Sequence, residues 1–322
     1  MKILILRFSS IGDIVLTTPV IRVLKQQLPH CAIHFCTKSA FRSLLQANPY
    51  LDKVHLLDKK LNELIVALKA ENFDYIIDLH HNLRTAIIKR KLGVKSFSFD
   101  KLNWQKWLYV NLKINKMPDV HIVDRYMETV KELGVTNDGA GLDYFIPSGE
   151  EVDVASLPPA HQGGYIAYAI GANHNTKKLP LHKMIELCET IGKPIILLGG
   201  KDDAENAGSV EEYFLKRKNT SAVIYNACGK YNLNQSASLL KQADEVYSHD
   251  TGLMHIASAF RKKIHTIWGN TTPQIGMYPY QTAHINYEVK GLSCRPCSKI
   301  GYTSCPLVHF KCMNEQHFVE SK

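Results

Sequence analysis

The tripeptide Asp250-Thr251-Gly252 combines a carboxylate, a hydroxyl and a flexible turn at one point of the chain. Apolar residues at 246–247 predict a short buried strand before it, and the apolar spacing over 253–260 predicts an amphipathic helix after it. A strand, a tight turn and a helix start can bind phosphate, because free backbone N–H groups and the helix dipole face the anion. The alternative is that Asp250 only caps the helix and His255 is an ordinary core residue.

Asp13 is the second candidate for chemistry. It follows Ser9-Ser10-Ile11-Gly12, a loop that comes directly after the apolar stretch 2–8. A carboxylate at the end of a buried strand suits a general base, which must reach the hydroxyl that it deprotonates. The alternative is that Asp13 is an ordinary cap for the first helical turn.

A glycine pair at Gly199-Gly200 follows an apolar stretch at 194–198 and precedes a predicted helix at 204–216. Glycine lets a ligand approach the backbone closely, and an acid just beyond can hold ribose hydroxyls. Both Asp202 and Asp203 are candidates for that role. The motif by itself is weak, since a glycine pair after a strand is often only a turn.

Four of the eight cysteines lie within nineteen positions near the C-terminal end, at Cys294, Cys297, Cys305 and Cys312. A Cys-x-x-Cys pair with two further thiolates can hold structural zinc. The second pair is spaced more widely than in an ordinary zinc ribbon. We therefore expect reduced structural thiols first, with a metal or a disulfide as the alternative.

Strand and helix patterns alternate along the chain, with a Pro- and Gly-rich linker at 148–164. In the first half, expected strands lie at 2–8, 32–36, 54–57 and 73–79, with helices at 19–27, 38–47, 62–70 and 121–133. In the second half, expected strands lie at 165–170, 194–198, 223–226 and 263–268, with helices at 181–191, 204–216 and 233–242. This alternation predicts an α/β protein with two Rossmann-like doubly wound domains, at residues 1–155 and 156–322.

The net charge of +9 is concentrated in one region. Residues 84–116 contain nine Lys or Arg against a single acid, with two tryptophans and a tyrosine at 104–109. A basic, aromatic surface recruits an anionic partner, such as nucleic acid, anionic lipid or a phosphorylated substrate. No nucleic-acid-binding module is recognisable around it.

Two segments resemble the ADP-heptose:lipopolysaccharide heptosyltransferases, glycosyltransferase family 9. The stretch from Asp250 to Ala257 is similar to the donor-site signature of that family, and the stretch from Arg7 to Pro19 is similar to its first loop. Partial matches at 171–180, 199–203 and 268–273 extend the resemblance over nearly the whole chain. The resemblance implies the GT-B fold, in which two Rossmann-like domains face a cleft.

The resemblance also implies a reaction, the inverting transfer of heptose from ADP-heptose to the lipopolysaccharide inner core, with Asp13 as the base. Lys177 matches the lysine of the family pattern Lys-x-Trp-Pro. Leu179 stands in place of the Trp, so Lys178 remains an alternative. The expected donor-side residues are Asn173, Thr176, Lys177, Gly199, Gly200, Asp202, Asp203, Asp250, Thr251, Gly252, Leu253, Met254 and His255. The expected acceptor-side residues are Ser9, Ser10, Gly12, His80, Arg84, Lys101 and Lys106.

The expected partners are a nucleotide-sugar donor, an anionic lipid-linked glycan acceptor and the inner-membrane surface, with no nucleic acid. No cofactor is expected, because no Asp-x-Asp pair at a strand end suits a nucleotide-bound Mg²⁺. No apolar run reaches the roughly 20 residues of a membrane span, so a cytoplasmic, peripheral protein is expected. The alternatives are a related GT-B transferase or epimerase that uses another nucleotide sugar, and a basic nucleic-acid-binding protein.

Overall fold

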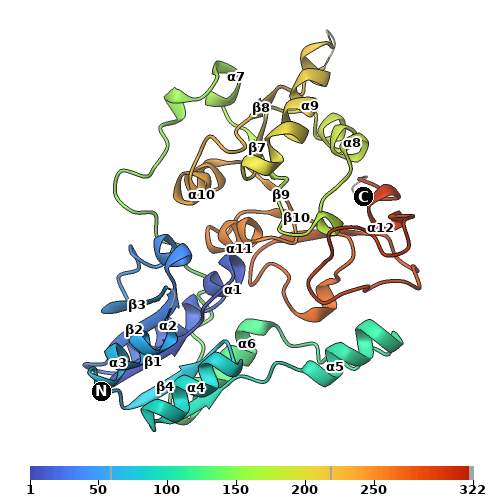
Figure 1. Ribbon diagram of the computed structural model, residues 1–322. Coiled ribbons are helices and arrows are strands. Elements are labelled where there is room, and N and C mark those ends of the chain that lie inside the picture. Colours follow the sequence, from blue (N-terminus) through green and yellow to red (C-terminus); the bar gives the residue numbers. More distant parts are fainter. Residues whose placement is uncertain (59, 218–219, 319–322) are drawn as a thin grey trace. The chain divides into compact units, whose positions relative to one another are not determined.

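The computed structural model describes residues 1–58, 60–217 and 220–318, and the chain forms two compact units (Figure 1). Unit 1 consists of Met1–Lys101 and Val120–Pro147, and unit 2 of Leu102–Asp119 and Ser148–Lys322. The expectation of two parallel-sheet α/β domains is confirmed. The division differs from the expected boundary at residue 155, because unit 2 begins at 148 and also includes the segment 102–119.

Unit 1 is built on a five-stranded parallel sheet of order β3-β2-β1-β4-β5. Its strands are β1 (Lys2–Leu6), β2 (Ala32–Lys38), β3 (Lys53–Leu57), β4 (Tyr75–Asp78) and β5 (Lys95–Ser98). The central strand β1 is buried from Ile3 to Leu6, as expected for a strand that is covered on both faces. At its carboxyl end, Leu6 pairs with Cys36 on one side and Asp78 on the other.

Short and long helices connect these strands. They are α1 (Ile11–Val15), α2 (Thr18–Gln27), α3 (Leu61–Lys69), α4 (Leu83–Leu92) and α6 (Ile122–Met127), with 3-10 turns at Ser39–Leu44 and Glu128–Leu133. The helix expected at 38–47 is only a 3-10 turn. We had not predicted α4 and β5. Only Thr85 and Ile88 of α4 are buried, so it lacks a regular apolar stripe, and β5 is a short edge strand.

Unit 2 contains a six-stranded parallel sheet of order β11-β10-β9-β6-β7-β8. Its strands are β6 (Ile166–Ala169), β7 (Ile195–Leu198), β8 (Ile224–Asn226), β9 (Val246–His249), β10 (Ile264–Trp268) and β11 (His284–Glu288). Its main helices are α5 (Asn103–Trp107), α7 (Pro159–Gln162), α8 (Leu181–Ile191), α9 (Ala204–Leu215), α10 (Leu233–Gln242), α11 (Gly252–Ala259) and α12 (Lys311–Asn314). We had not predicted β11. Each unit has its own apolar core.

The order of strands reverses beside the first strand of each unit. From β1 the chain adds β2 and β3 on one side, and then β4 and β5 on the other side. From β6 it adds β7 and β8, and then β9, β10 and β11 on the opposite side. The loops that leave the two strands at such a reversal diverge and commonly form a ligand site. The loops after β1 and β4 in unit 1, and after β6 and β9 in unit 2, are therefore the places to look.

Membrane-spanning structure is a separate question. Among the described residues, none of the helices combines the length and apolarity that crossing a bilayer requires.

Candidate active-site residues in the two units

Arg7 organises the loop after β1. Its side chain is buried, and its Nε donates a hydrogen bond to the Ser9 carbonyl at 2.8 Å. One terminal nitrogen donates to the carbonyl of Leu79 and to the hydroxyl of Tyr126, and the other lies 2.5 Å from Oδ1 of Asp13. A buried guanidinium with four partners has little freedom to move, so this network fixes the loop between β1 and α1.

Asp13 both caps α1 and remains accessible. Its Oδ2 accepts hydrogen bonds from the Ser10 amide at 3.1 Å and the Ser10 hydroxyl at 2.7 Å, which is the predicted helix-cap alternative. Its side chain nevertheless stays 23% exposed. Burial acts to raise the pKa of Asp13, but the charge of Arg7 and the bonds from Ser10 outweigh it and leave the pKa below its usual value. The carboxylate is therefore ionised at neutral pH.

His80 lies in the loop after β4, the other strand at the reversal in unit 1. Its backbone amide donates to Oδ1 of Asp78 at 3.1 Å, and its ring packs edge-on against Phe8. Burial, followed by the charges of Arg7 and Lys101, lowers the pKa of His80 to about 4. The imidazole is therefore neutral at pH 7, and it lies close enough to Asp13 to interact with its charge.

The other expected acceptor-side residues fall into two groups. Ser9 and Ser10 lie in the loop before α1, Gly12 precedes Asp13 on α1, and Arg84 is exposed on α4. Lys101 belongs to unit 1, where its Nζ donates to the His81 carbonyl at 3.3 Å. Lys106 lies on α5, in unit 2. The basic patch predicted over 84–116 is therefore divided between the two units, which corrects its assignment to the first domain.

In unit 2, an ion pair joins the two loops at the reversal of strand order. Nζ of Lys177 lies 2.7 Å from Oδ2 of Asp250, which also accepts from the hydroxyl of Thr271 at 2.8 Å. Burial acts to raise the pKa of Asp250, but Lys177 and these hydrogen bonds lower it further than burial raises it. The cap of α11 is Thr251, whose hydroxyl accepts from the Leu253 amide at 3.2 Å. The helix-cap alternative for Asp250 is therefore wrong.

A second ion pair joins the loop after β6 to the loop after β7. Nζ of Lys178 lies 2.7 Å from Oδ1 of Asp203, whose Oδ2 accepts from the Gly200 amide at 2.9 Å. Asp203 is buried and both of its oxygens are engaged, whereas Asp202 is exposed. A Cβ on Gly199 would lie 2.8 Å from Asp203 Oδ2. Gly199 is thus needed for loop packing, and Asp202 is the acid that a ligand can reach.

Three expected donor-side side chains face the protein interior. The buried hydroxyl of Thr176 donates to the Tyr302 carbonyl at 3.1 Å and accepts from the Tyr302 amide at 2.8 Å. It therefore anchors the C-terminal segment. Met254 and His255 are buried on the inner side of α11. The accessible start of α11 is limited to Thr251, Gly252 and Leu253, and Asn173 is exposed in the loop after β6.

We had not predicted two polar residues at strand ends in unit 2. His249, the last residue of β9, is fully buried; its Nε2 accepts from the Leu179 amide at 3.1 Å and its Nδ1 donates to the Ile170 carbonyl at 3.0 Å. Burial lowers the pKa of His249 to about 4, so the neutral ring holds the loop 170–180. Asn270 follows β10; its buried side-chain amide has no hydrogen-bond partner among the described residues. Polar residues at the carboxyl ends of strands were the signal that could have identified both.

The C-terminal cysteines are free thiols. Burial and neighbouring thiols raise the pKa of Cys297 to about 11, and burial is the largest cause that raises the pKa of Cys312 to about 12. Both are therefore protonated at neutral pH. Within the described part of the chain, no three of the four sulfur atoms lie within 4.8 Å of one another. The arrangement differs from the close set of thiolates that a bound zinc ion requires, and the metal alternative remains a prediction.

Comparison with known proteins identifies relatives over most of the chain. The sequence model of glycosyltransferase family 9 (heptosyltransferase) matches residues 61–306. The chain is 24% identical over 299 residues to lipopolysaccharide heptosyltransferase 1 of Campylobacter coli, covering 84% of each protein. Escherichia coli ADP-heptose lipopolysaccharide heptosyltransferase II has a similar fold, with a TM-score of 0.69, 18% identity and 98% coverage of both chains. An Escherichia coli heptosyltransferase solved with ADP-2-deoxy-2-fluoro heptose has a TM-score of 0.66 and 23% identity, and the match covers 88% of this chain and 93% of that one.

Proposed function

This chain belongs to glycosyltransferase family 9, and from that premise we propose that it transfers heptose from ADP-heptose to the lipopolysaccharide inner core. That it is a glycosyltransferase follows from the family. The donor, the acceptor and inversion at the anomeric carbon are the proposal. The names of the relatives support heptose and lipopolysaccharide, and the loops at the two strand reversals supply residues for the two halves of the reaction.

The observation that carries the proposal is the Lys177–Asp250 ion pair beside the start of α11. A diphosphate is an anion, and it meets here a lysine and the N-terminus of an eight-residue helix. As the sugar leaves, negative charge grows on the phosphate oxygens. A positive group already in place stabilises that charge, and one such donor lowers a barrier by about 3 kcal/mol. The exposed carboxylate of Asp202 is then available for a ribose hydroxyl.

In the proposed mechanism, Asp13 is the general base. The low pKa of Asp13 makes the carboxylate a weak base toward the hydroxyl of an unreacted sugar. The same low pKa keeps the carboxylate ionised, which is the form that accepts a proton. When the acceptor oxygen bonds to the anomeric carbon, its proton becomes acidic enough for a carboxylate to accept. Arg7 holds the carboxylate in place throughout, and so limits the reorganisation that the reaction requires.

We propose that the transfer needs no divalent metal, because Lys177 and α11 can neutralise the leaving diphosphate. Activity should therefore be unchanged in excess chelator. Complete loss of activity in chelator that is restored by Mg²⁺ would contradict this part of the proposal.

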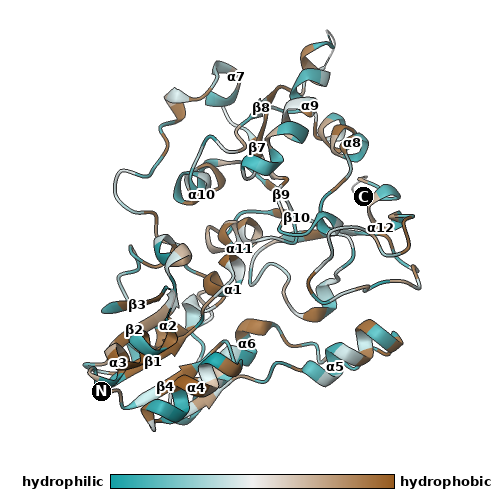
Figure 2. Cartoon of the chain, in the orientation of Figure 1, coloured by the Kyte–Doolittle hydropathy of each residue, from teal (hydrophilic) through white to brown (hydrophobic). Residues whose placement is uncertain are grey.

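The segment Leu102–Asp119 of unit 2 is proposed to face the lipid-linked acceptor and the inner-membrane surface. Trp104 and Trp107 stack at 5.3 Å between ring centroids, and they are 65% and 48% exposed. Apolar and polar residues both occur along this element (Figure 2). Nζ of Lys113 donates to the Pro296 carbonyl at 2.7 Å and so attaches the segment to the rest of unit 2. Exposed indoles beside lysines suit an anionic lipid–water boundary.

Calorimetric titration with ADP, UDP and GDP tests the donor assignment. ADP should bind most tightly. Tightest binding of UDP would replace the ADP assignment by another nucleotide sugar, and no binding of any nucleotide would contradict the proposed transferase mechanism.

A comparison of binding to anionic vesicles with binding to duplex DNA tests the partner of the segment 102–119. Salt-sensitive binding to vesicles is expected, and preference for DNA would favour the nucleic-acid alternative.

A further inference from the structure

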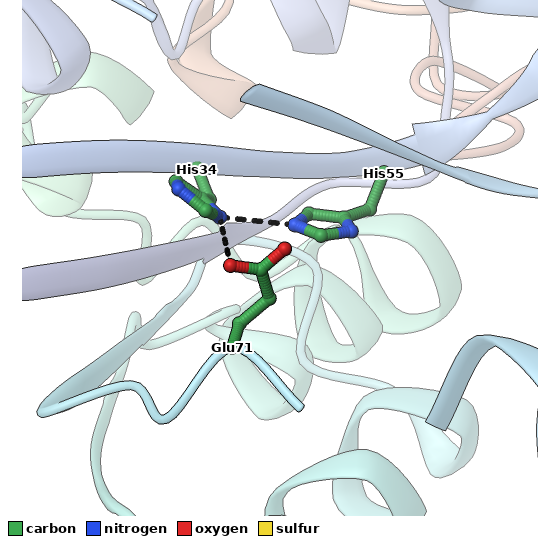
Figure 3. Close-up of side chains that lie close together, drawn as sticks. All are labelled: His34, His55 and Glu71. Atoms are coloured by element: carbon green, nitrogen blue, oxygen red, sulfur yellow. Dashed lines mark hydrogen bonds and ion pairs between the residues drawn. The ribbon is translucent and has the colours of Figure 1, made fainter. Parts of the chain in front are cut away.

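Two buried histidines and a glutamate lie together in unit 1 (Figure 3). His34 is the third residue of β2 and His55 the third residue of β3, and Glu71 lies between α3 and β4. Asp13 lies on α1, after β1, and His80 follows β4, so none of the three belongs to these segments. The proposed transfer reaction therefore uses none of these three side chains.

Their ligand atoms have the spacing of a metal site. Nδ1 of His34 lies 3.0 Å from Nε2 of His55 and 3.8 Å from Oε2 of Glu71. One ligand atom from each residue lies within 4.8 Å of the other two. A zinc-type ion with bonds of about 2.0–2.2 Å keeps neighbouring tetrahedral ligands about 3.3 Å apart. The three atoms therefore need only small shifts to surround one ion.

The protonation states also suit a metal. Burial, followed by the charge of His34, lowers the pKa of His55 to about 4, and burial lowers the pKa of His34 as well. Hydrogen bonds from lysines lower the pKa of Glu71 to about 2. At pH 7 the site thus offers two neutral imidazoles and a carboxylate, which are the forms that bind metal. One of the two facing nitrogens, Nδ1 of His34 or Nε2 of His55, carries the proton of their hydrogen bond. When an ion binds, that proton moves to the other nitrogen of the same ring, so the site loses no proton.

We propose that His34, His55 and Glu71 bind a divalent transition-metal ion of the zinc type. Two imidazoles and one carboxylate bind Zn²⁺ and similar transition-metal ions better than they bind Mg²⁺ or Ca²⁺. The bound ion ties β2, β3 and the segment before β4 together. Because none of its ligands belongs to the segments that hold Asp13 and His80, its effect is on the stability of unit 1 and not on turnover.

Two lysines set the strength of this site. Nζ of Lys2 lies 3.0 Å from Oε2 of Glu71, and Lys53 pairs with its Oε1. Both cations compete with a metal for the carboxylate and repel its charge. The side chain of Lys53 is 55% exposed, so it can move into solvent when an ion enters. The site is consequently weaker with Lys53 than without it.

Titration of the metal-stripped, full-length protein with Co²⁺ tests the proposal, because Co²⁺ reports its ligands by absorption. We expect one equivalent bound without the near-ultraviolet band of a cobalt–thiolate bond. Exchange of His55 for Gln should weaken that binding at least about tenfold, and Lys53→Ala should tighten it about fivefold. The melting temperature should rise with Co²⁺ in the parent and in Lys53→Ala, but not in His55→Gln.

A variant with both Cys294 and Cys297 replaced by Ser is the control for the C-terminal thiols, and it should keep the binding unchanged. Binding that shows the thiolate band and disappears in this variant would overturn the proposal, as would Co²⁺ binding that is equal in His55→Gln and the parent. If His55→Gln does not fold, Lys53→Ala decides: unchanged or weaker Co²⁺ affinity there overturns the proposal. Absence of any Co²⁺ binding overturns it as well.

Discussion

At the strand reversal of each unit a carboxylate expected in the site forms an ion pair with a cation, but the two pairs are held differently. In unit 1 both members have further partners: Arg7 has three besides Asp13, and Asp13, the more exposed member, also accepts from Ser10. In unit 2 only the anion has a further partner: Asp250 also accepts from Thr271, whereas both hydrogen bonds that the structure shows for Nζ of Lys177, at 2.7 Å and 3.3 Å, go to Asp250.

This difference assigns the two loops different tasks. A carboxylate held on a rigid arginine is positioned to meet a neutral hydroxyl and take its proton. A lysine held on a rigid carboxylate is positioned to leave that partner for a more highly charged diphosphate. The same architectural position, beside the first strand of a doubly wound sheet, thus offers a base in unit 1 and an anion site in unit 2. Substitutions in the two units should separate these two tasks.

The largest expected effect follows the exchange of Asp13 for Asn. Loss of a general base lowers the turnover rate about 10²–10⁴-fold. The exchange also removes the partner of a buried arginine, so some loss of stability is expected in addition. Asp138→Asn is the control for removing a carboxylate partner of a buried arginine, because Asp138 pairs with the buried Arg22 in unit 1 and is 22% exposed; Arg22 keeps Asp143 as a second partner. Melting curves should show that both variants are destabilised, and steady-state kinetics should show that only Asp13→Asn is inactive. Turnover of Asp13→Asn within a few-fold of the parent would remove Asp13 from the mechanism.

A smaller effect is expected for Lys177→Ala, which removes the proposed contact with the leaving diphosphate. The turnover rate should fall about 10²-fold. Lys178→Ala is the control: the neighbouring lysine has similar exposure, and its partner, Asp203, only joins two loops. We expect Lys178→Ala to lower the melting temperature with a much smaller loss of turnover. Equal losses in the two variants would mean that the loop acts as a whole and that Lys177 has no special role.

His249 should contribute to the pH dependence of stability, because its neutral ring holds the loop 170–180. The pKa of His249 is about 4 in the folded chain against about 6.5 when unfolded, so the unfolded chain binds the proton first. The stability that this residue contributes is present above pH 6.5 and is lost as the pH falls toward 4, up to about 3 kcal/mol. Urea unfolding between pH 7 and 4.5 should show a smaller pH-dependent loss in His249→Gln than in the parent. Identical pH profiles would show that His249 does not hold the loop as a neutral ring.

The smallest expected effect concerns Lys101→Glu and Lys106→Glu, made separately because the two lysines belong to different units. Each should weaken use of an anionic, lipid-linked acceptor about fivefold, since one lysine near an anionic surface contributes about 1 kcal/mol. ADP affinity should stay the same, because neither is expected to contact the donor. Weaker ADP binding by Lys106→Glu alone would reassign the segment 102–119 to the donor side.

The fold and the positions of the main loops could be predicted from the sequence, because they depend on local patterns. The alternation of apolar strands and amphipathic helices indicated both sheets. Asp250 does follow β9 directly, and Asp13 lies on α1, the first helix after β1. The partners of these residues could not be predicted, since they are distant in sequence. Tyr126 and Arg7 are hydrogen-bonded although they lie 119 positions apart in the sequence, and Lys177 and Asp250 although they lie 73 positions apart.

Other features depended on side-chain geometry. Asp202 and Asp203 are equivalent as a sequence pattern, and only the turn after β7 makes one exposed and the other a buried partner of Lys178. Segment 102–119 belongs to unit 2 because of long-range contacts. One of them is the hydrogen bond from the Thr272 hydroxyl to the Tyr109 hydroxyl at 3.4 Å. No local periodicity indicates such contacts.

The affinity for ADP of Asp13→Asn and Lys177→Ala, measured by calorimetry beside the parent, tests the division of tasks most directly. The account predicts a dissociation constant within about twofold of the parent for Asp13→Asn, because the base takes no part in holding the nucleotide. It predicts binding at least about tenfold weaker for Lys177→Ala, because a charge-assisted contact to the diphosphate is lost. Equal weakening in both variants, or unchanged binding in Lys177→Ala, would contradict it.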